Sequence, residues 1–119
     1  EDRLCPSFSP MENGQMALKE KWKEEKMAQA MTCLLPKECL TRPVSTLSGG
    51  MKRRTAILRA VLAPSHMLVM DEPFTGLDEA LKLEVIRYIL ENRRNRFLLI
   101  TTHQEEDVKL LGGVRIQLD

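Results

Sequence analysis

Two adjacent carboxylates, Asp71 and Glu72, stand where a short apolar run ends, in the sequence MLVMDEP. We expect the run from Met67 to Met70 to form a buried strand of a parallel sheet, and ligands of such sheets bind at the carboxyl ends of strands. Side chains alternate along a strand, so the two carboxylates point in different directions. One could hold Mg²⁺ through water while the other faces an attacking water. The alternative is a solvated turn, with Pro73 ending the strand.

A histidine, His103, directly follows a second apolar run, FLLITT. It should emerge at the same edge of the sheet as Asp71, because both residues follow parallel strands. A lone histidine at a strand end is more often a local hydrogen-bonding residue than a catalyst. The segment Thr75-Gly76-Leu77-Asp78, taken alone, indicates a turn in which Asp78 caps the next helix.

A third group of residues, Leu47-Ser48-Gly49-Gly50, opens a helix. The start of a helix leaves backbone N–H groups unpaired and carries partial positive charge. The two glycines let a phosphate or another backbone approach closely, and the Ser48 hydroxyl adds a donor. An ordinary helix cap by Ser48 explains the same residues, and without further context we favour it.

These residues need a scaffold of helices and strands, which the periodicity and the prolines predict. Residues 1–14 indicate a loop, and Ala, Leu, Lys, Glu and Met then favour one helix over 15–35, followed by a loop over 36–46. Later helices are expected from Ser48 or Gly49 to about Ala63, from Asp78 to Asn92 and over 105–111, and strands over 67–70, 97–102 and 114–118. This order predicts an α/β protein with parallel strands joined by crossover helices.

The composition excludes several classes of protein. The formal net charge of the 119 residues is +1, too balanced for a nucleic-acid footprint. No apolar run approaches the roughly 20 residues that span a bilayer. The three cysteines, Cys5, Cys33 and Cys39, have no paired spacing, which favours free thiols over a zinc site.

The order and spacing of the four motifs resemble one family, the ATP-binding cassette (ABC) ATPases. LSGGMKRRTAILRAVL (47–62) resembles the family's signature motif, and MLVMDEP (67–73) resembles Walker B with its catalytic glutamate. TGLD (75–78) resembles the D-loop, and TTH (101–103) resembles the segment with the switch histidine. The resemblance covers residues 44–119. It implies a partial P-loop NTPase fold, with part of an α-helical subdomain beside the parallel sheet.

The first residues, EDRLCPSFSPMEN, resemble the stretch that follows the Q-loop glutamine in importer-type members. We therefore expect residues 1–46 to be the remainder of the Q-loop region and the helical subdomain. Residues 47–119 would hold the signature helix and the C-terminal part of the ATPase core.

The resemblance also implies a mechanism that uses ATP and Mg²⁺. Asp71 would position Mg²⁺ through water, Glu72 would orient or deprotonate the attacking water, and His103 would contact the γ-phosphate. Members of the family pair two ATPase domains head to tail. Ser48, Gly49 and Gly50 would then bind the γ-phosphate of ATP held by the partner domain, and Asp78 would lie near the dimer interface.

The expected partners are this second ATPase domain and a transmembrane permease, without nucleic acid, at the cytoplasmic face of the cell membrane. The 119 residues contain no G-x-x-x-x-G-K-[ST] loop, and Met51 stands where glutamine commonly follows LSGG. Without that loop we expect the chain alone to be inactive, as a fragment of an ATPase subunit that powers transport. Two alternatives stay open, a non-transport ABC ATPase of chromosome maintenance or translation, and a non-catalytic interaction module.

Overall fold

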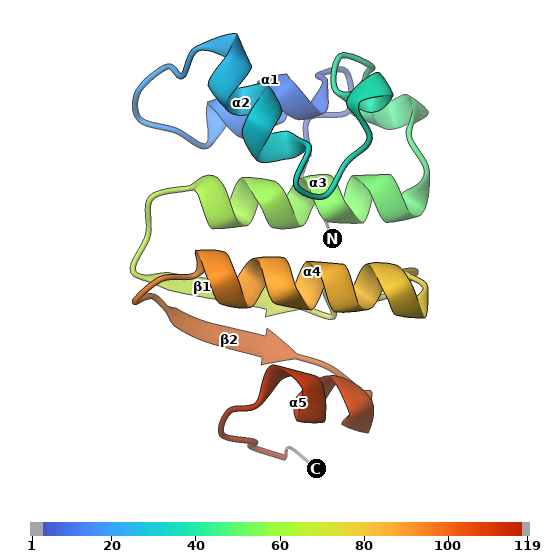
Figure 1. Cartoon of the computed structure of the whole chain (residues 1–119), viewed down its shortest axis with the longest axis vertical. Coiled ribbons are helices and arrows are strands. Elements are labelled where there is room, and N and C mark those ends of the chain that lie inside the picture. The colour runs from blue at the N-terminus through green and yellow to red at the C-terminus, as the bar shows by residue number, and fades with distance from the viewer. Residues whose placement is uncertain (1–3, 118–119) are drawn as a thin grey trace.

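The helix that opens with Ser48 and the two glycines lies across the middle of the molecule, between a helical layer and the sheet (Figure 1). The computed structural model describes residues 4–117. This helix, α3, begins where the sequence predicts, because the Ser48 hydroxyl accepts a hydrogen bond of 3.2 Å from the N–H of Met51. It ends just before Pro64, which cannot continue a helix.

The other elements lie on the two sides of α3 (Figure 1). Two α-helices and two 3₁₀ turns form the layer on one side, and a two-stranded sheet with two further helices lies on the other. In chain order the elements are α1 (Pro10–Met16), α2 (Glu24–Met31), η1 (Lys37–Cys39), η2 (Val44–Thr46), α3 (Gly49–Leu62), β1 (Met67–Asp71), α4 (Glu79–Asn92), β2 (Phe97–Thr101) and α5 (Glu105–Leu111).

The N-terminal layer differs from the sequence prediction of a loop and one long helix. Helix α1 begins at Pro10, inside the predicted loop, and a capping box holds its start. The Glu12 N–H donates to the Ser9 hydroxyl at 3.1 Å, and the Ser9 N–H donates to the Glu12 carboxylate at 3.0 Å. The S-x-x-E spacing with proline at the first helical position was the sequence signal for this start.

The predicted helix over 15–35 is wrong because the chain turns back between α1 and α2. This turn packs Gly14 of α1 against Met27 and Met31 of α2, which are 2% and 0% exposed. A Cβ atom at Gly14 would lie 2.3 Å from the Met31 methyl carbon, so the glycine makes room for these side chains. A straight helix would have left this apolar stripe facing water.

The sheet consists of β1 and β2, paired in parallel with Met67 opposite Phe97 and Asp71 opposite Thr101. Helix α4 connects them, as the sequence predicts, and the α/β class is confirmed. The third predicted strand does not form over residues 114–117, and Leu118 lies outside the described residues.

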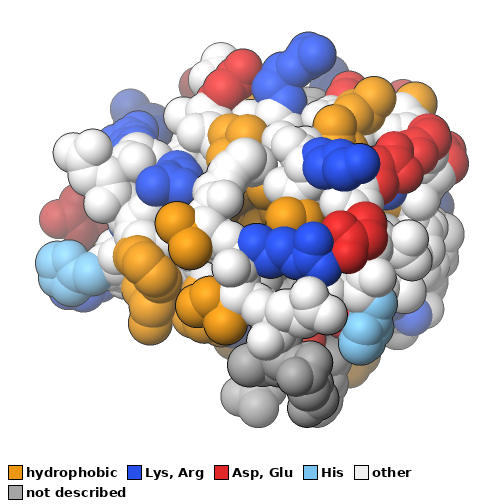
Figure 2. Space-filling view, turned by 90° about the horizontal axis from the view of Figure 1, so that it is seen from below, with side chains coloured by type: hydrophobic (Ala, Val, Ile, Leu, Met, Phe, Trp, Pro, Cys, Tyr) orange, Lys and Arg blue, Asp and Glu red, His pale blue; other side chains and the backbone are white. Residues whose placement is uncertain are grey.

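Only one face of the sheet packs against the hydrophobic core of the described chain. Leu68 and Met70 are buried, whereas the alternate residues Met67 and Val69 are 49% and 57% exposed. The same alternation leaves Phe97 and Leu99 of β2 exposed. The prediction of strands buried on both faces is therefore wrong for residues 4–117, because the described helices cover a single face. Viewed from the α5 end, the molecule also shows hydrophobic side chains gathered at its surface (Figure 2).

A continuous core connects the helical layer to the sheet. The cluster runs from the methionines of α2 through α3 to one face of α4. Its members include Met27, Met31, Leu34, Leu35, Leu40, Val44, Leu47, Ile57, Leu58, Val61, Leu68, Met70, Phe74, Val85, Ile86 and Ile89. Among the helices formed by residues 4–117, none has the length and apolar character that crossing a bilayer requires.

One arginine closes the C-terminal ends of two helices. The Arg96 guanidinium donates to the Val61 and Ala63 carbonyls at the end of α3, at 2.8 and 3.3 Å. It also donates to the Asn92 and Arg93 carbonyls at the end of α4, at 2.8 and 2.9 Å. The last carbonyls of a helix lack partners within it and carry partial negative charge, so a cation here stabilises both ends.

We expect Arg96→Met to lower the free energy of unfolding by about 1.5–3 kcal/mol, the range for hydrogen bonds that involve a charged group. Urea denaturation of the chain, followed by circular dichroism, measures the change. Arg87→Met is a matched control, because Arg87 is an exposed arginine of α4. Equal losses in both variants would contradict a specific capping role for Arg96.

Candidate functional site

The carboxyl ends of β1 and β2 bring four polar residues together. Asp71 and Thr101 are register partners, and the Thr101 hydroxyl donates a hydrogen bond to the Asp71 carboxylate. The Glu72 N–H donates to the Thr101 carbonyl at 3.0 Å and to its hydroxyl at 3.2 Å. The histidine, His103, lies two residues beyond Thr101. The two predicted carboxylates and the predicted histidine thus share one edge of the sheet.

Thr101 is the member of this group that the sequence reasoning missed. Its hydroxyl contacts Asp71 and the backbone of Glu72 together, so it fixes the relative placement of the two acidic residues. The sequence held a partial signal for Thr101, because a threonine ends the second apolar run just as Asp71 ends the first. The register of the two strands was needed to find it.

Glu72 has an unusual backbone conformation, with φ at 48°. This is the left-handed region, which residues with a side chain seldom adopt and which costs free energy. The conformation turns the Glu72 carboxylate toward His103, and Glu72 Oε1 lies 3.1 Å from His103 Nε2. The His103 side chain is 91% exposed and the Glu72 side chain is 32% exposed, so both can meet a ligand.

The start of α3 lies against the loop that follows β1. A Cβ atom at Gly50 would lie 3.7 Å from a methyl carbon of Leu77 and 3.8 Å from the Gly76 carbonyl oxygen. Gly76 has φ at 83°, which permits the sharp turn of this loop. Ser48 and Gly49 are exposed, and a Cβ at Gly49 would meet nothing within 4 Å. A ligand or another protein can therefore reach this helix start.

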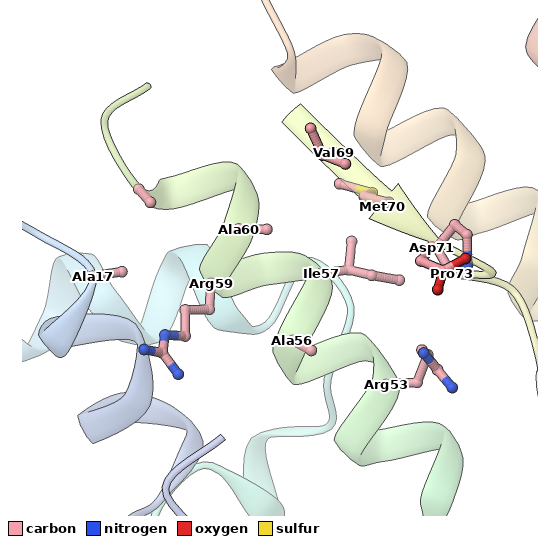
Figure 3. A pocket seen from close by; sticks show the side chains of 11 residues that line it. Ala17, Arg53, Ala56, Ile57, Arg59, Ala60, Val69, Met70, Asp71 and Pro73 are labelled. Carbon is pink, nitrogen blue, oxygen red and sulfur yellow. The ribbon is translucent and has the colours of Figure 1, made fainter. Parts of the chain in front are cut away.

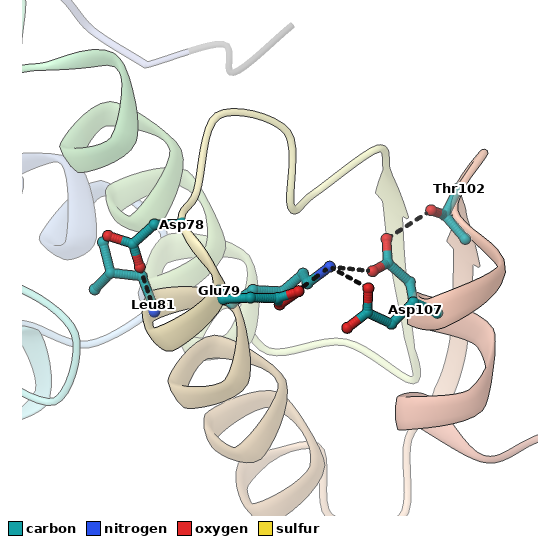
Figure 4. A network of polar contacts seen from close by, with 7 residues as sticks. Asp78, Glu79, Leu81, Thr102 and Asp107 are labelled. Atoms are coloured by element: carbon teal, nitrogen blue, oxygen red, sulfur yellow. Dashed lines mark hydrogen bonds and ion pairs between the residues drawn. The ribbon is translucent and has the colours of Figure 1, made fainter.

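Asp78 caps α4, as the sequence predicts. Its carboxylate accepts a hydrogen bond of 2.9 Å from the Leu81 N–H (Figure 4). Asp78 is exposed at the end of the loop that contacts Gly50. The structure therefore gives Asp78 a definite structural role and leaves its carboxylate at the surface.

The basic residues near the start of α3 separate into different environments. Arg54 donates to the Leu34 carbonyl at 2.8 Å and to the Gly50 carbonyl at 3.2 Å, which ties the helical layer to the start of α3. Arg53 instead lines a cavity of about 740 Å³ between α3 and β1, together with Asp71. Figure 3 shows Arg53 and Asp71 at one end of this cavity and Arg59 at the other.

The donors at the sheet edge fit a Mg²⁺ ion that keeps most of its ligands as water and phosphate. Asp71 offers an exposed carboxylate, and the Thr101 hydroxyl stands beside it. Within residues 4–117 there is no cluster of three or more histidine, cysteine, aspartate and glutamate side chains that could enclose a metal. Mg²⁺ is commonly bound through one or two carboxylates and substrate phosphates, so a single aspartate suits it.

Comparison with known proteins shows the fold class and the family of the chain. In class, the chain forms part of a P-loop NTPase fold, with polar residues at the carboxyl ends of two parallel strands. A family model described as "ABC transporter" matches residues 1–75, more than half of the chain. The chain belongs to the ABC transporter family.

Individual relatives cover different shares of the chain. A thiamine import ATP-binding protein, ThiQ of Haemophilus influenzae, is 31% identical over 96% of this chain and 55% of its own length. A Nod factor export ATP-binding protein of Bradyrhizobium diazoefficiens is 48% identical over 57% of this chain and 22% of its own length. The chain thus spans about half the length of the thiamine protein.

The fold also matches solved cassettes. A structure described as a dimeric post-hydrolysis state of the ATP-binding cassette MJ0796, bound to ADP and Pi, superposes with a TM-score of 0.78. The match covers 92% of this chain and 52% of that chain, at 18% identity. At this identity the similarity supports the fold, which is the partial P-loop NTPase fold that the sequence predicts.

Proposed function

We propose that these residues form the C-terminal part of an ATPase subunit that powers transport across a membrane. The observation that carries the proposal is the contact of 3.1 Å between Glu72 and His103, beside Asp71, at the carboxyl edge of a parallel sheet. A carboxylate and an imidazole in direct contact at this edge can both reach one water molecule that lies beside the pair. That arrangement suits attack on a phosphoryl group.

The roles of the residues follow from their positions. Asp71 would hold Mg²⁺ through water, and the ion when bound would supply positive charge to the phosphate oxygens. Glu72 orients the attacking water and accepts its proton, and its place beside His103 limits the directions that this water can take. His103 donates a hydrogen bond to the γ-phosphate. Phosphoryl transfer depends mainly on positioning and charge stabilisation, so these three contacts account for the chemistry that this chain supplies.

The start of α3 serves a second ATPase domain. Ser48, Gly49 and Gly50 bind the γ-phosphate of ATP held by that domain, and Asp78 lies at the interface of the head-to-tail dimer. The exposure of Ser48 and Gly49 and the open space around Gly49 support this role. The dimeric state in the description of MJ0796 is consistent with it.

The domain boundary at residues 46 and 47 also belongs to this proposal. Residues 1–46 are the remainder of the Q-loop region and the helical subdomain, which meets a membrane permease. Residues 47–119 hold the signature helix and the C-terminal part of the ATPase core. The subunit works at the cytoplasmic face of the membrane, and the thiamine import relative, which matches 96% of the chain, favours import.

We expect the 119-residue chain alone to show no Mg²⁺-dependent ATP turnover, because it lacks a P-loop lysine and backbone nest for the phosphates. The parent protein, in which these residues accompany a P-loop, should hydrolyse ATP. Release of phosphate from Mg·ATP, measured for both proteins at equal concentration, tests the two statements. Turnover by the chain alone would contradict the first, and a parent protein without turnover would contradict the proposed function.

A further inference from the structure

A buried ion pair connects α4 to the turn that carries His103. Asp107, in the first turn of α5, is 2% exposed, and its Oδ1 lies 2.9 Å from the ammonium nitrogen of Lys82. The Lys82 side chain is only 12% exposed. A carboxylate this deeply buried requires a partner, since an unpaired buried charge is costly. Lys82 also lies 3.9 Å from both Glu79 and Glu106.

The second oxygen of Asp107 reaches the turn itself. The Thr102 hydroxyl donates a hydrogen bond of 2.8 Å to Asp107 Oδ2, and it accepts one of 3.1 Å from the Gln104 N–H. The same hydroxyl thus holds the backbone on both sides of His103. The side chain of Gln104, the N-cap residue, does not cap α5, so the Thr102 hydroxyl and Asp107 close this turn instead (Figure 4).

The imidazole depends on this turn for its position. The His103 side chain is 91% exposed, and its contact with Glu72 joins two side chains at the surface. Packing against the core cannot hold such a side chain in place, so its direction follows the backbone of residues 102–104. The hydrogen bond with Asp107 raises the pKa of Lys82 above its ordinary value, although burial of the ammonium acts in the opposite direction.

We propose that Lys82, Asp107 and Thr102 are positioning residues that hold the His103 turn opposite Glu72. Lys82 lies one turn after Asp78, and its N–H donates to the Asp78 carbonyl at 2.9 Å, so the network also connects the end of the D-loop to the histidine. The contact between His103 and Glu72 lies within the 119-residue chain, so it can be tested without measuring ATP hydrolysis. Its importance for hydrolysis rests on the proposed function.

Nuclear magnetic resonance of the 119-residue chain tests the structural half of the proposal. When Glu72→Gln is the only substitution, it should shift the imidazole signals of His103, because the two side chains touch. The imidazole signals of His66 should stay unchanged. Thr102→Val removes the hydroxyl with little change of shape, and we expect the response of His103 to Glu72→Gln to be lost in this background. Thr102→Ser, which restores a hydroxyl, should retain the response.

Variants of the ion pair extend this test. Lys82→Met and Asp107→Asn should abolish the His103 response, and Lys82→Arg should keep it. Lys109→Met is the matched control, because Lys109 is an exposed lysine of α5. Should Asp107→Asn fail to fold, the comparison of Thr102→Val with Thr102→Ser still decides. An undiminished His103 response in folded Thr102→Val and Lys82→Met would overturn the proposal.

Kinetics of the parent protein test whether the position of the His103 turn matters for ATP hydrolysis. Thr102→Val should lower kcat for ATP hydrolysis by about 10- to 100-fold, the range for a small misplacement of a reacting group, with KM for ATP unchanged. Thr102→Ser should restore kcat. Normal kcat in Thr102→Val would overturn the positioning role in hydrolysis. A wild-type parent without turnover would contradict the proposed function, while the resonance measurement would still decide whether the network holds His103.

Discussion

Glu72→Gln in the parent protein is expected to abolish most ATP hydrolysis while leaving ATP binding intact. The amide keeps the size of the side chain and loses the ability to accept a proton from water. A positioned general base typically contributes about 100- to 10,000-fold to a rate, so we expect kcat to fall by about this factor. Phosphate release gives kcat, and equilibrium binding of a fluorescent ATP analogue measures affinity.

Glu91→Gln provides the matched control for this experiment. Glu91 is an exposed glutamate of α4, on an element that does not carry the carboxylate pair. It should retain wild-type turnover and binding. Normal turnover in Glu72→Gln would refute the role of Glu72 as the base. An equal loss of ATP affinity and of turnover would show that Glu72 acts in ATP binding instead.

Ile89→Ala is expected to be the most destabilising of the substitutions considered for the core. Ile89 is 0% exposed in α4 and belongs to the cluster that connects α3, α4 and the sheet. Truncation removes three carbons from a packed interior, and such changes cost about 2–5 kcal/mol. Urea denaturation of the 119-residue chain would show this as a lower midpoint with a similar slope.

The neighbouring residue offers a control with the same backbone environment. Leu90 is 39% exposed, so Leu90→Ala should lower the free energy of unfolding by less than about 1 kcal/mol. A comparable loss in both variants would show that Ile89 does not lie in a cohesive core. A large change of slope in Ile89→Ala would indicate a change in the compactness of the native or the denatured state, or unfolding that is no longer two-state.

The elements from α3 to α5 could be predicted from sequence because local signals agree there, whereas the strand predicted over 114–118 does not form over residues 114–117. Ser48 and Asp78 cap α3 and α4, Pro64 follows α3, and both apolar runs form strands. The early region failed for a tertiary reason. Residues 15–35 have helical composition throughout, but burying Met27 and Met31 against Gly14 requires a turn that no local propensity indicates.

The site shows the same division between local and tertiary information. Asp71, Glu72 and His103 could be identified from their places after apolar runs, and their shared edge follows from parallel pairing. The direct contact between Glu72 and His103 depends on the left-handed backbone at Glu72, and the amino-acid sequence gives no indication of that conformation. Thr101 and the ion pair of Lys82 with Asp107 depend on register and on the packing of α4 against α5.

The backbone conformation of Glu72 also bears on how this position can change during evolution. A left-handed residue with a side chain carries a cost of about 1 kcal/mol or more that glycine would remove. Glycine at this position would therefore relax the turn after β1 while deleting the carboxylate beside His103. Selection for a stable domain and selection for ATP hydrolysis would oppose each other at residue 72, and a copy freed from hydrolysis could gain stability by losing its acid.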